Sequence, residues 1–131
     1  MEKIYVEHPD KADKNFTTGA YSPAVIMDGW VFVSGQACVD FATSKFILGT
    51  IEEETHLTMH NVKRILESAG CTLDDVVKST VHLADINDFD RYNTVYATYF
   101  EGIKPARTTV QCGLGHGIKV EVDVIAKLKN K

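Results

Sequence analysis

Long apolar runs are missing from this sequence. No run of large apolar residues is longer than Trp30–Val33, whereas a helix needs about 20 such residues to cross a bilayer. Residues 1–15 carry charges of both signs and have no apolar segment of the kind found in signal peptides. These absences argue against a membrane protein and a secreted protein, so we expect a cytosolic location.

An excess of basic residues is also missing. The chain has 14 Lys and Arg against 18 Asp and Glu, which gives a formal net charge of −4 with histidines neutral. Nucleic-acid-binding domains are typically basic, and anionic membrane surfaces attract basic segments. We therefore expect neither nucleic acid nor a membrane surface as a partner.

Cysteines are few and are not spaced for metal binding. Cys38, Cys71 and Cys112 are odd in number, widely separated and without a Cys-x-x-Cys motif. This spacing predicts neither a disulfide framework nor a zinc site. We therefore expect each cysteine to be a small, buried hydrophobic residue. The sequence also lacks a phosphate-binding loop and a dinucleotide fingerprint. We expect no metal and no cofactor.

The composition is that of an ordinary globular protein. The chain has 131 residues, of which 44% are apolar and 24% charged. It contains no linker, low-complexity segment or internal repeat. We therefore expect a single domain over residues 1–131.

A hairpin is the clearest local signal. Asp28-Gly29 separates the apolar runs Ala24–Met27 and Trp30–Val33. Asp-Gly in this position favours a type I′ turn, because both central residues of that turn need positive φ. Gly35 follows the second run and permits a β-bulge or a close backbone approach.

Apolar spacings of three and four predict helices, and alternation predicts strands. The predicted helices cover residues 51–69, capped by Thr50 with Glu53 and ended by Gly70, and residues 88–101. Besides the hairpin, strands are predicted over residues 4–6, 76–83, 107–112 and 119–128. The order β-β-β-α-β-α-β-β is an α+β pattern in which both helices cover one face of a sheet.

The other face of this sheet is predicted to be half apolar. It would carry Thr109, Glu121 and Ile125 side by side. In the strand before the second helix, alternation gives Lys78 and His82 to a wet face and places Val77 with Val81 on the opposite side. A half-apolar sheet face is suited to packing on another subunit.

Arg107 and Glu121 form the sharpest candidate pair, and both lie on strands predicted near the C-terminus. An arginine can hold a carboxylate or phosphate by two parallel hydrogen bonds, and a glutamate can place and deprotonate a water. If the two strands are neighbours, both side chains open into one wet or inter-subunit space. A cross-strand ion pair without chemistry is the alternative that the spacing leaves open.

Other candidate residues give weaker signals. Tyr21 and Ser34 bring hydroxyls close to glycines, Ser34 directly before Gly35. From the sequence alone, turn chemistry is the favoured explanation for both. Thr109 shares a strand face with Arg107, and β propensity is a sufficient reason for it.

His56 and His60 lie four residues apart on the first predicted helix. This spacing can hold zinc when a third ligand arrives. The two histidines lie opposite the apolar stripe and among charged residues, so we expect a solvated helix face in place of a metal site.

Several segments together resemble the Rid (reactive intermediate deaminase, YjgF) family, which is also labelled endoribonuclease L-PSP. The Pro-Ala-Arg segment followed by the strand with Glu121 is the signature of that family. Two departures are Ala20, where the family often has Pro, and Thr109, where some members have Cys. The matching segments run in order along nearly the whole chain: Gly19–Val25, Val33–Gln36, Asn61–Gly70, Asp85–Asn93, Pro105–Arg107 and Val120–Val122.

The resemblance implies a chorismate-mutase-like fold and a homotrimer whose sheets form a central barrel, with sites between subunits. The implied activity is the cofactor-free hydrolysis of 2-aminoacrylate-type enamines and imines to 2-oxo acids and ammonia. Arg107 matches the arginine that clamps the substrate carboxylate, and Glu121 matches the acid that orients the attacking water. Tyr21, Ser34, Asn93 and Thr109 match positions that line the pocket, and Gly35 contributes backbone.

Two other functions remain open at this point. A non-catalytic regulatory trimer would bind a carboxylate metabolite in the same cleft, where Arg107 is needed and Glu121 is dispensable. An endoribonuclease would follow the family's other label, but the net charge of −4 argues against it.

Overall fold

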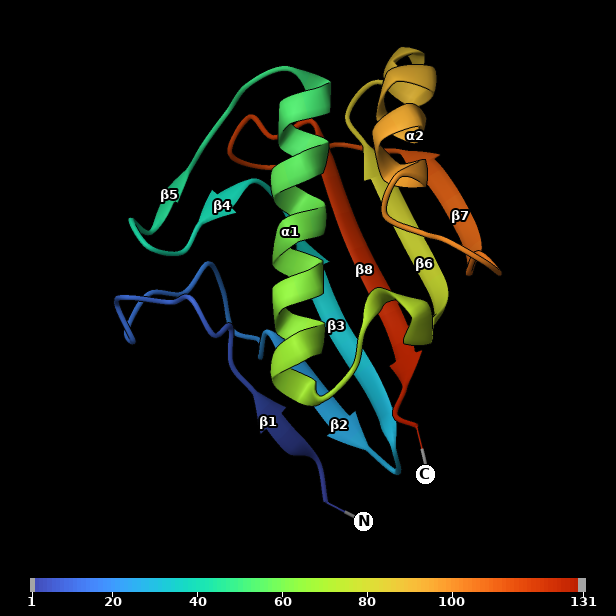
Figure 1. Cartoon of the computed structure of the whole chain (residues 1–131). Helices are drawn as coiled ribbons and strands as arrows, with labels where there is room; N and C mark the ends of the chain where they lie inside the picture. Colours follow the sequence, from blue (N-terminus) through green and yellow to red (C-terminus); the bar gives the residue numbers. More distant parts are fainter. Residues whose placement is uncertain (1, 130–131) are drawn as a thin grey trace.

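Both helices of the protein lie on one face of a six-stranded sheet, as a computed structural model shows (Figure 1). The structure describes residues 2–129. The helices are α1 (Ile51–Ala69) and α2 (Phe89–Ala97), and single 3₁₀ turns cover Leu73–Asp75 and Ile86–Asp88. The strands are β1 (Ile4–Val6), β2 (Ala24–Met27), β3 (Trp30–Gln36), β4 (Val39–Asp40), β5 (Lys45–Phe46), β6 (Val76–Leu83), β7 (Ala106–Gln111) and β8 (Val120–Lys127).

The strand order in the main sheet is β1-β2-β3-β8-β6-β7. Neighbouring strands are antiparallel except β6 and β7, which run parallel with α2 between them in the chain. The expected α+β order of elements is confirmed, with one addition. β4 and β5 form a small hairpin before α1, and strands of two residues are too short for alternation to reveal.

The hairpin between β2 and β3 forms as the sequence predicts. Met27 pairs with Trp30, and the residues between them have φ of 53° at Asp28 and 78° at Gly29. These positive values are those a type I′ turn requires.

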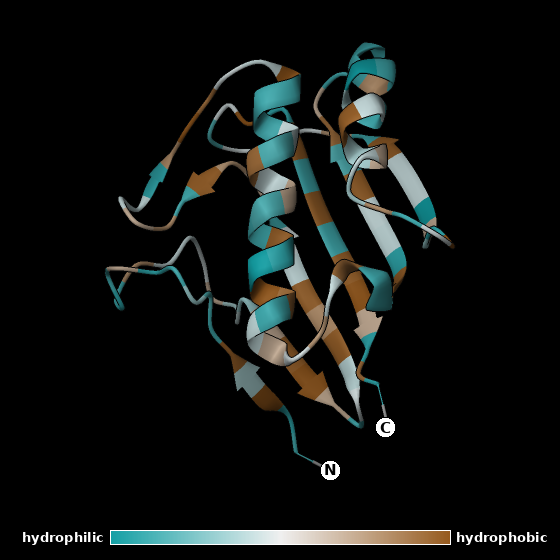
Figure 2. Cartoon of the chain, viewed as in Figure 1, coloured by the Kyte–Doolittle hydropathy of each residue, from teal (hydrophilic) through white to brown (hydrophobic). Residues whose placement is uncertain are grey.

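The core lies between the helices and the inner face of the sheet. The Thr50 hydroxyl and the Glu53 carboxylate cap α1 reciprocally, and Gly70 ends it in the left-handed conformation with φ of 90°. Figure 2 shows hydrophobic strands beneath α1 and a largely hydrophilic outer surface on the helix. The fully buried apolar side chains include Val31, Met59, Val62, Ile65, Leu66, Val81, Leu83, Val120 and Val122.

Two local predictions were wrong, one about the face that Val77 occupies and one about the end of the second helix. Val77 is exposed, because an irregularity in register between Val76 and Lys78 gives its core position to Val76. Helix α2 ends at Ala97 and not at residue 101, because the N–H groups of the next residues bond to carbonyls three positions back.

The opposite face of the sheet, called the open face below, carries no helix within residues 2–129. Trp30, Phe32 and Val110 are each about 40% exposed on it. Glu121 lies on this face as expected, but Thr109 does not. Thr109 pairs with the fully buried Val81, so its side chain faces the helices. Within the described part of the chain, no helix is both long and apolar enough to cross a membrane.

Candidate active site

Strand β8 places Glu121 on the open face. Its neighbours Val120 and Val122 are fully buried, so alternation along the strand turns Glu121 away from the core. Gly35 lies against it, because a Cβ atom built on Gly35 would come within 2.8 Å of the Glu121 carboxyl carbon. A side chain on residue 35 would displace the carboxylate from the position that it has here.

A β-bulge in β3 creates this close approach. The register shifts between Val33 and Gln36, so that Ser34 and Gly35 together oppose Asp123 of β8. The bulge and the close approach expected at Gly35 are both confirmed.

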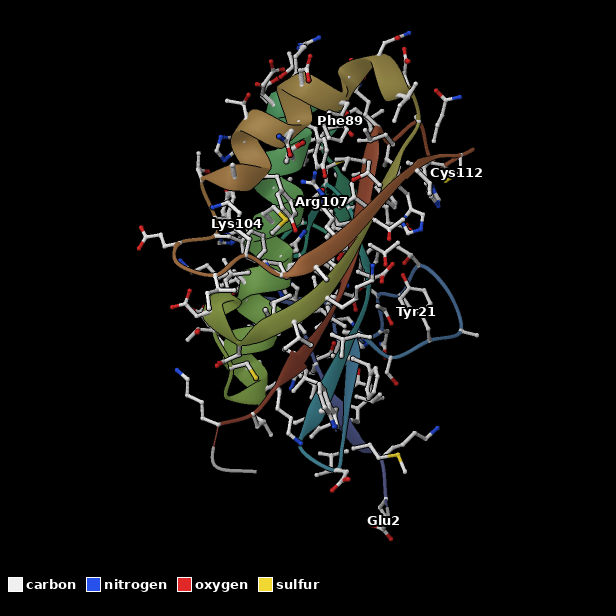
Figure 3. The ribbon with its side chains drawn as sticks, turned by 90° about the vertical axis from the view of Figure 1, so that its right-hand side faces the viewer. Glu2, Tyr21, Phe89, Lys104, Arg107 and Cys112 are labelled. Atoms are coloured by element: carbon white, nitrogen blue, oxygen red, sulfur yellow. The ribbon has the colours of Figure 1, made fainter. Side chains whose placement is uncertain are left out.

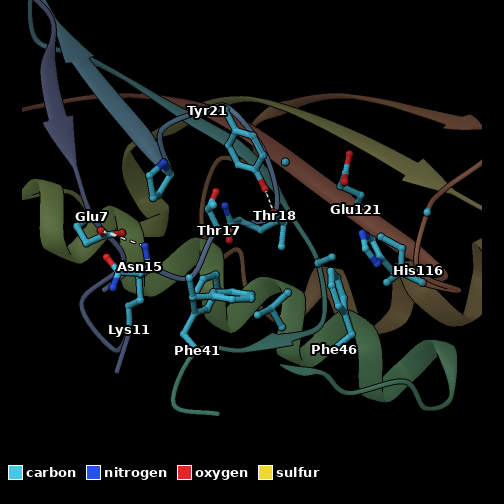
Figure 4. A pocket seen from close by; sticks show the side chains of 18 of the residues that line it. Glu7, Lys11, Asn15, Thr17, Thr18, Tyr21, Phe41, Phe46, His116 and Glu121 are labelled. Carbon is cyan, nitrogen blue, oxygen red and sulfur yellow. Dashed lines mark hydrogen bonds and ion pairs between the residues drawn. The ribbon is translucent and has the colours of Figure 1, made fainter. Parts of the chain in front are cut away.

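Ser34 anchors the loop that carries Tyr21. Its hydroxyl donates to the Ser22 carbonyl at 2.7 Å, which holds the loop against β3. The Tyr21 ring is half-exposed and its hydroxyl is hydrogen-bonded to that of Thr18. Figure 4 shows Tyr21 and Glu121 along the same side of a pocket.

Two hollows meet at these residues. A cavity of about 590 Å³ lies among the N-terminal loop, the β4–β5 hairpin and residues 115–118. A second hollow of about 510 Å³ extends over the open face of β3 and β8. Tyr21, Gly35 and Glu121 line both, so the carboxylate stands where the two hollows join.

Arg107 lies on the other face of the sheet. In the pairing of β7 with β6, Arg107 lies opposite Ser79, which is fully buried on the helix side of the sheet. The guanidinium donates from Nη1 to the Asn93 side-chain oxygen at 2.7 Å. This bond uses one terminal nitrogen of a fork that carries five N–H donors.

Three aromatic rings of α2 surround the guanidinium. Its central carbon lies 5.5, 5.5 and 4.9 Å from the ring centroids of Phe89, Tyr92 and Tyr96. The Thr109 hydroxyl bonds that of Tyr92 at 3.2 Å. The helix periodicity that predicts these rings as core residues gives no sign that they stack on a cation, so sequence reasoning missed this aromatic cage.

The positive charge of Arg107 has no carboxylate partner among residues 2–129. No carboxylate of residues 2–129 lies within 4 Å of its guanidinium nitrogens. Burial raises the pKa of Tyr92 and of Tyr96, so both phenols are neutral at physiological pH. A fixed, uncompensated guanidinium is suited to binding a carboxylate from outside the chain.

The two halves of the candidate site do not meet within one chain. β6 lies between β7 and β8, so Arg107 and Glu121 are on strands roughly 10 Å apart and on opposite faces. Figure 3 shows Arg107 between α2 and β7, and Tyr21 on the loop beyond the other side of the sheet. The condition stated for a shared space, that the two strands are neighbours, is not met in the single chain.

A buried carboxylate that sequence reasoning missed holds the start of β8. Glu54 accepts hydrogen bonds from both nitrogens of Lys119, at 2.8 and 2.9 Å, from the Gly49 N–H and from the Cys38 thiol. Burial works to raise the pKa of Glu54, but these bonds outweigh it and keep the pKa below its usual value. Glu54 thereby fixes the residue two positions before Glu121.

The other side chains singled out in the sequence lie outside both halves. Burial, aided by the charge of Glu54, raises the pKa of Cys38 to about 12. Cys38 and Cys71 are buried as expected, and Cys112 is partly buried. His56 and His60 are exposed, and His56 bonds the Tyr99 hydroxyl at 2.7 Å.

Comparison with known proteins places the chain in a family. The family model described as endoribonuclease L-PSP matches residues 12–128. The chain belongs to this family, the Rid family. The match confirms the resemblance that the sequence motifs carry.

Individual Rid proteins match over most of their length. The 2-iminobutanoate/2-iminopropanoate deaminase of Rattus norvegicus is 44% identical over 109 residues, which are 82% of this chain and 80% of the rat protein. A crystal structure of an Entamoeba histolytica protein assigned to endoribonuclease L-PSP is 42% identical with a TM-score of 0.89, and covers 97% of this chain and 100% of that one. The structure of E. coli TdcF with bound serine is 32% identical with a TM-score of 0.85, and covers 95% and 98%. The α+β fold with two helices on a mixed sheet is therefore the fold of the Rid family.

Proposed function

We propose that this Rid protein hydrolyses 2-imino acids and their enamine tautomers to 2-oxo acids and ammonia. The observation that carries the proposal is the uncompensated, caged guanidinium of Arg107. It is a carboxylate-binding group, and its counterpart Glu121 is a carboxylate exposed to a cavity. The similarity to the 2-iminobutanoate/2-iminopropanoate deaminase of the rat supports this reaction.

The site is completed by a second copy of the chain. Arg107, Asn93 and Thr109 of one subunit face Glu121, Tyr21, Ser34 and Gly35 of the next. The apolar side chains on the open face provide a surface for this contact. Two different patches meet in such a contact, which makes it heterologous, and heterologous contacts can close into a ring. We propose the homotrimer with a central barrel of sheets that the family resemblance implies.

Each residue then has one task in the reaction. The Arg107 fork binds the substrate carboxylate, and Asn93 and the aromatic cage keep the fork oriented. An enamine first takes a proton on carbon and releases one from nitrogen to become the imine. Glu121 orients a water and accepts a proton as the oxygen attacks the C=N carbon.

The remaining steps balance the reaction. The proton held by Glu121 passes to nitrogen, which gives the carbinolamine. The hydroxyl proton of the carbinolamine then passes to the nitrogen as the C–N bond breaks, so that ammonia leaves and a 2-oxo acid remains. One water is consumed, and Glu121 returns to its starting state. The proposed chemistry uses no metal and no cofactor. The cytosolic location and the single domain over residues 1–131 stay predictions.

A coupled assay tests this function. A pyridoxal-phosphate dehydratase generates 2-aminoacrylate from serine, and pyruvate release is followed with and without the protein. We expect the wild type to accelerate release. Arg107→Ala and Glu121→Gln should each lower kcat/KM by about 100-fold or more, while Lys63→Ala on the outer face of α1 should change nothing. If the wild-type protein does not raise the rate of pyruvate release above the rate in buffer alone, the proposal is wrong.

A binding protein without turnover is the second candidate. TdcF is described with bound serine, which is a carboxylate but not an imine. In that case Arg107→Ala should abolish binding of small carboxylates, while Glu121→Gln should leave it intact. An endoribonuclease is not proposed, because the net charge of −4 offers no attraction for RNA.

A further inference from the structure

Three buried hydroxyl groups make no hydrogen bond within residues 2–129, those of Thr58, Ser79 and Tyr96. Nearly all buried polar groups in proteins are hydrogen-bonded, so each exception needs an explanation. Thr58 lies on α1, away from the elements that hold the guanidinium of Arg107. Ser79 and Tyr96, in contrast, lie on β6 and α2, and both residues are neighbours of Arg107.

Ser79 and Tyr96 lie on the buried side of the Arg107 guanidinium. Ser79 is opposite Arg107 in the pairing of β6 with β7 and is fully buried. The Tyr96 ring centroid is 4.9 Å from the central guanidinium carbon, and the residue is only 4% exposed. Figure 3 shows Arg107 in the space between α2 and β7. Two hydroxyls without partners are therefore gathered at the group that we propose as the carboxylate binder.

The Tyr96 hydroxyl is close to both other groups. Burial raises the pKa of Tyr96, while the Ser79 hydroxyl and the charge of Arg107 act to lower it. Such effects require close approach, although no hydrogen bond of good geometry joins the three groups. A phenol oxygen can accept from a guanidinium N–H and donate to a serine oxygen at the same time. The three groups are therefore arranged for a chain of two hydrogen bonds that is open in the free protein.

The other contacts of the guanidinium leave its buried side unfixed. Asn93 accepts from Nη1 at 2.7 Å. One turn before Tyr96 on α2, the Tyr92 hydroxyl is already hydrogen-bonded to Thr109 at 3.2 Å. Binding of a carboxylate by two parallel N–H groups needs a guanidinium plane that is fixed. The Tyr96 hydroxyl is in place to provide the second point at which the plane is held.

We propose that Tyr96 and Ser79 are positioning residues for carboxylate binding. When an anion binds the outer N–H groups of Arg107, the guanidinium donates to the Tyr96 hydroxyl, which donates to the Ser79 hydroxyl. Hydrogen bonds of functional sites are often long in the free protein and tighten in the complex. This inference rests on the proposed function, because it takes Arg107 as the group that binds the substrate carboxylate.

This role has a signature that a purely structural role lacks. A buried hydroxyl without a partner destabilises the folded protein, so its removal leaves the free energy of unfolding unchanged or increases it. In the complex the same hydroxyl is hydrogen-bonded, so its removal weakens binding. We therefore expect Tyr96→Phe and Ser79→Ala to weaken carboxylate binding without lowering the stability of the free protein.

Titration calorimetry with pyruvate and urea unfolding at one protein concentration measure these two effects. Tyr96→Phe should weaken pyruvate binding about tenfold, with a urea midpoint equal to or above that of the wild type. The double variant with Ser79→Ala should bind no more weakly than Tyr96→Phe alone, because Ser79 acts through Tyr96. Binding of wild-type strength in Tyr96→Phe would overturn the inference, and so would weaker binding together with a lower urea midpoint.

Thr58→Val and Tyr99→Phe are the matched controls. Thr58→Val removes the third unpartnered hydroxyl, on a helix that makes none of the contacts to Arg107 described above. Tyr99→Phe removes a tyrosine hydroxyl that is hydrogen-bonded to His56. Neither variant should change pyruvate binding, and only Tyr99→Phe should lower the urea midpoint, because it breaks an existing hydrogen bond.

Turnover separates this inference from the proposed function. In the dehydratase-coupled assay, Tyr96→Phe should raise KM about tenfold and change kcat by less than about twofold, because Glu121 is untouched. If the wild type hydrolyses the imine and Tyr96→Phe has the same KM, the inference fails and the deaminase proposal stands. If the wild type hydrolyses nothing but Tyr96→Phe binds pyruvate more weakly at full stability, the deaminase proposal fails and the positioning role stands.

Discussion

Gly35 is the residue whose size the site constrains most tightly. A Cβ atom there would come within 2.8 Å of the Glu121 carboxyl carbon and one of its oxygens. The backbone of Gly35 does not have positive φ, so alanine fits the main chain and acts only by displacing the carboxylate. We predict that Gly35→Ala lowers kcat about tenfold and changes the free energy of unfolding by less than about 1 kcal/mol. The dehydratase-coupled assay and urea unfolding measure the two quantities.

Gly113→Ala is the matched control for this prediction, because its added Cβ would meet nothing within 4 Å. A Gly35→Ala variant with full kcat would show that the position of the Glu121 carboxylate does not matter for the reaction.

The residues of the site could be read from the sequence, but their arrangement could not. Motif matches select Arg107, Glu121 and Asn93 by type and order. Which face each occupies depends on β6 lying between β7 and β8, a long-range pairing that no local pattern encodes. The stacking of the α2 rings on Arg107 could not be predicted either. An aromatic stripe at helical spacing is already explained by packing in the core, so it gives no sign of contact with a cation.

At the scale of elements, one buried histidine ties the N-terminal loop to α1 and to the β4 segment. The His8 Nε2 atom lies 2.9 Å from the Asn61 side-chain oxygen. The Asn61 nitrogen donates to the carbonyls of Ala37 and Val39, so its oxygen must accept. His8 Nδ1 accepts from the Asp10 N–H at 3.1 Å. This pattern fits only the neutral imidazole with its proton on Nε2.

The neutral form of His8 makes stability depend on pH. Burial lowers the pKa of His8 below the ordinary value of 6.5, despite the opposing effects of Asn61 and Asp10. As the pH falls below about 6.5, the unfolded chain binds a proton that the folded chain does not, so the free energy of unfolding decreases. We predict that urea midpoints fall between about pH 7.5 and pH 5.5, and that His8→Gln flattens this dependence.

His60→Gln is the control, because His60 lies close enough to influence His8 but is exposed. This variant should keep the pH dependence of the wild type. An unchanged dependence in His8→Gln would assign the effect to other groups.

Elements with strong local signals formed where they were predicted. The Asp28-Gly29 turn and the Thr50 capping box depend on residues adjacent in sequence, and such interactions do not need the rest of the fold. The β4–β5 hairpin and the irregularity at Val77 depend on tertiary pairing. Sequence periodicity therefore gave no sign of the first and the wrong face for the second.

At the scale of the whole molecule, one chain carries two incomplete sites. The Arg107 guanidinium lies on the helix side, whereas Glu121 faces a cavity on the open side. The exposed Phe32 lines the hollow beside Glu121 on the open face, and Trp30 is exposed on the same face. The proposed ring, in which each open face receives the Arg107 surface of the next copy, would account for these three observations together.

Mixing of inactive variants tests this arrangement. Arg107→Ala and Glu121→Gln subunits are each expected to be inactive alone. When equal amounts are unfolded together and refolded, a random ring places an intact Arg107 next to an intact Glu121 at about a quarter of its contacts. We predict recovery of about a quarter of the refolded wild-type activity in the dehydratase-coupled assay. The two variants mixed without unfolding are the control and should stay inactive. If the refolded mixture also stays inactive while the wild type regains activity, Arg107 and Glu121 act from the same chain and the inter-subunit site is wrong.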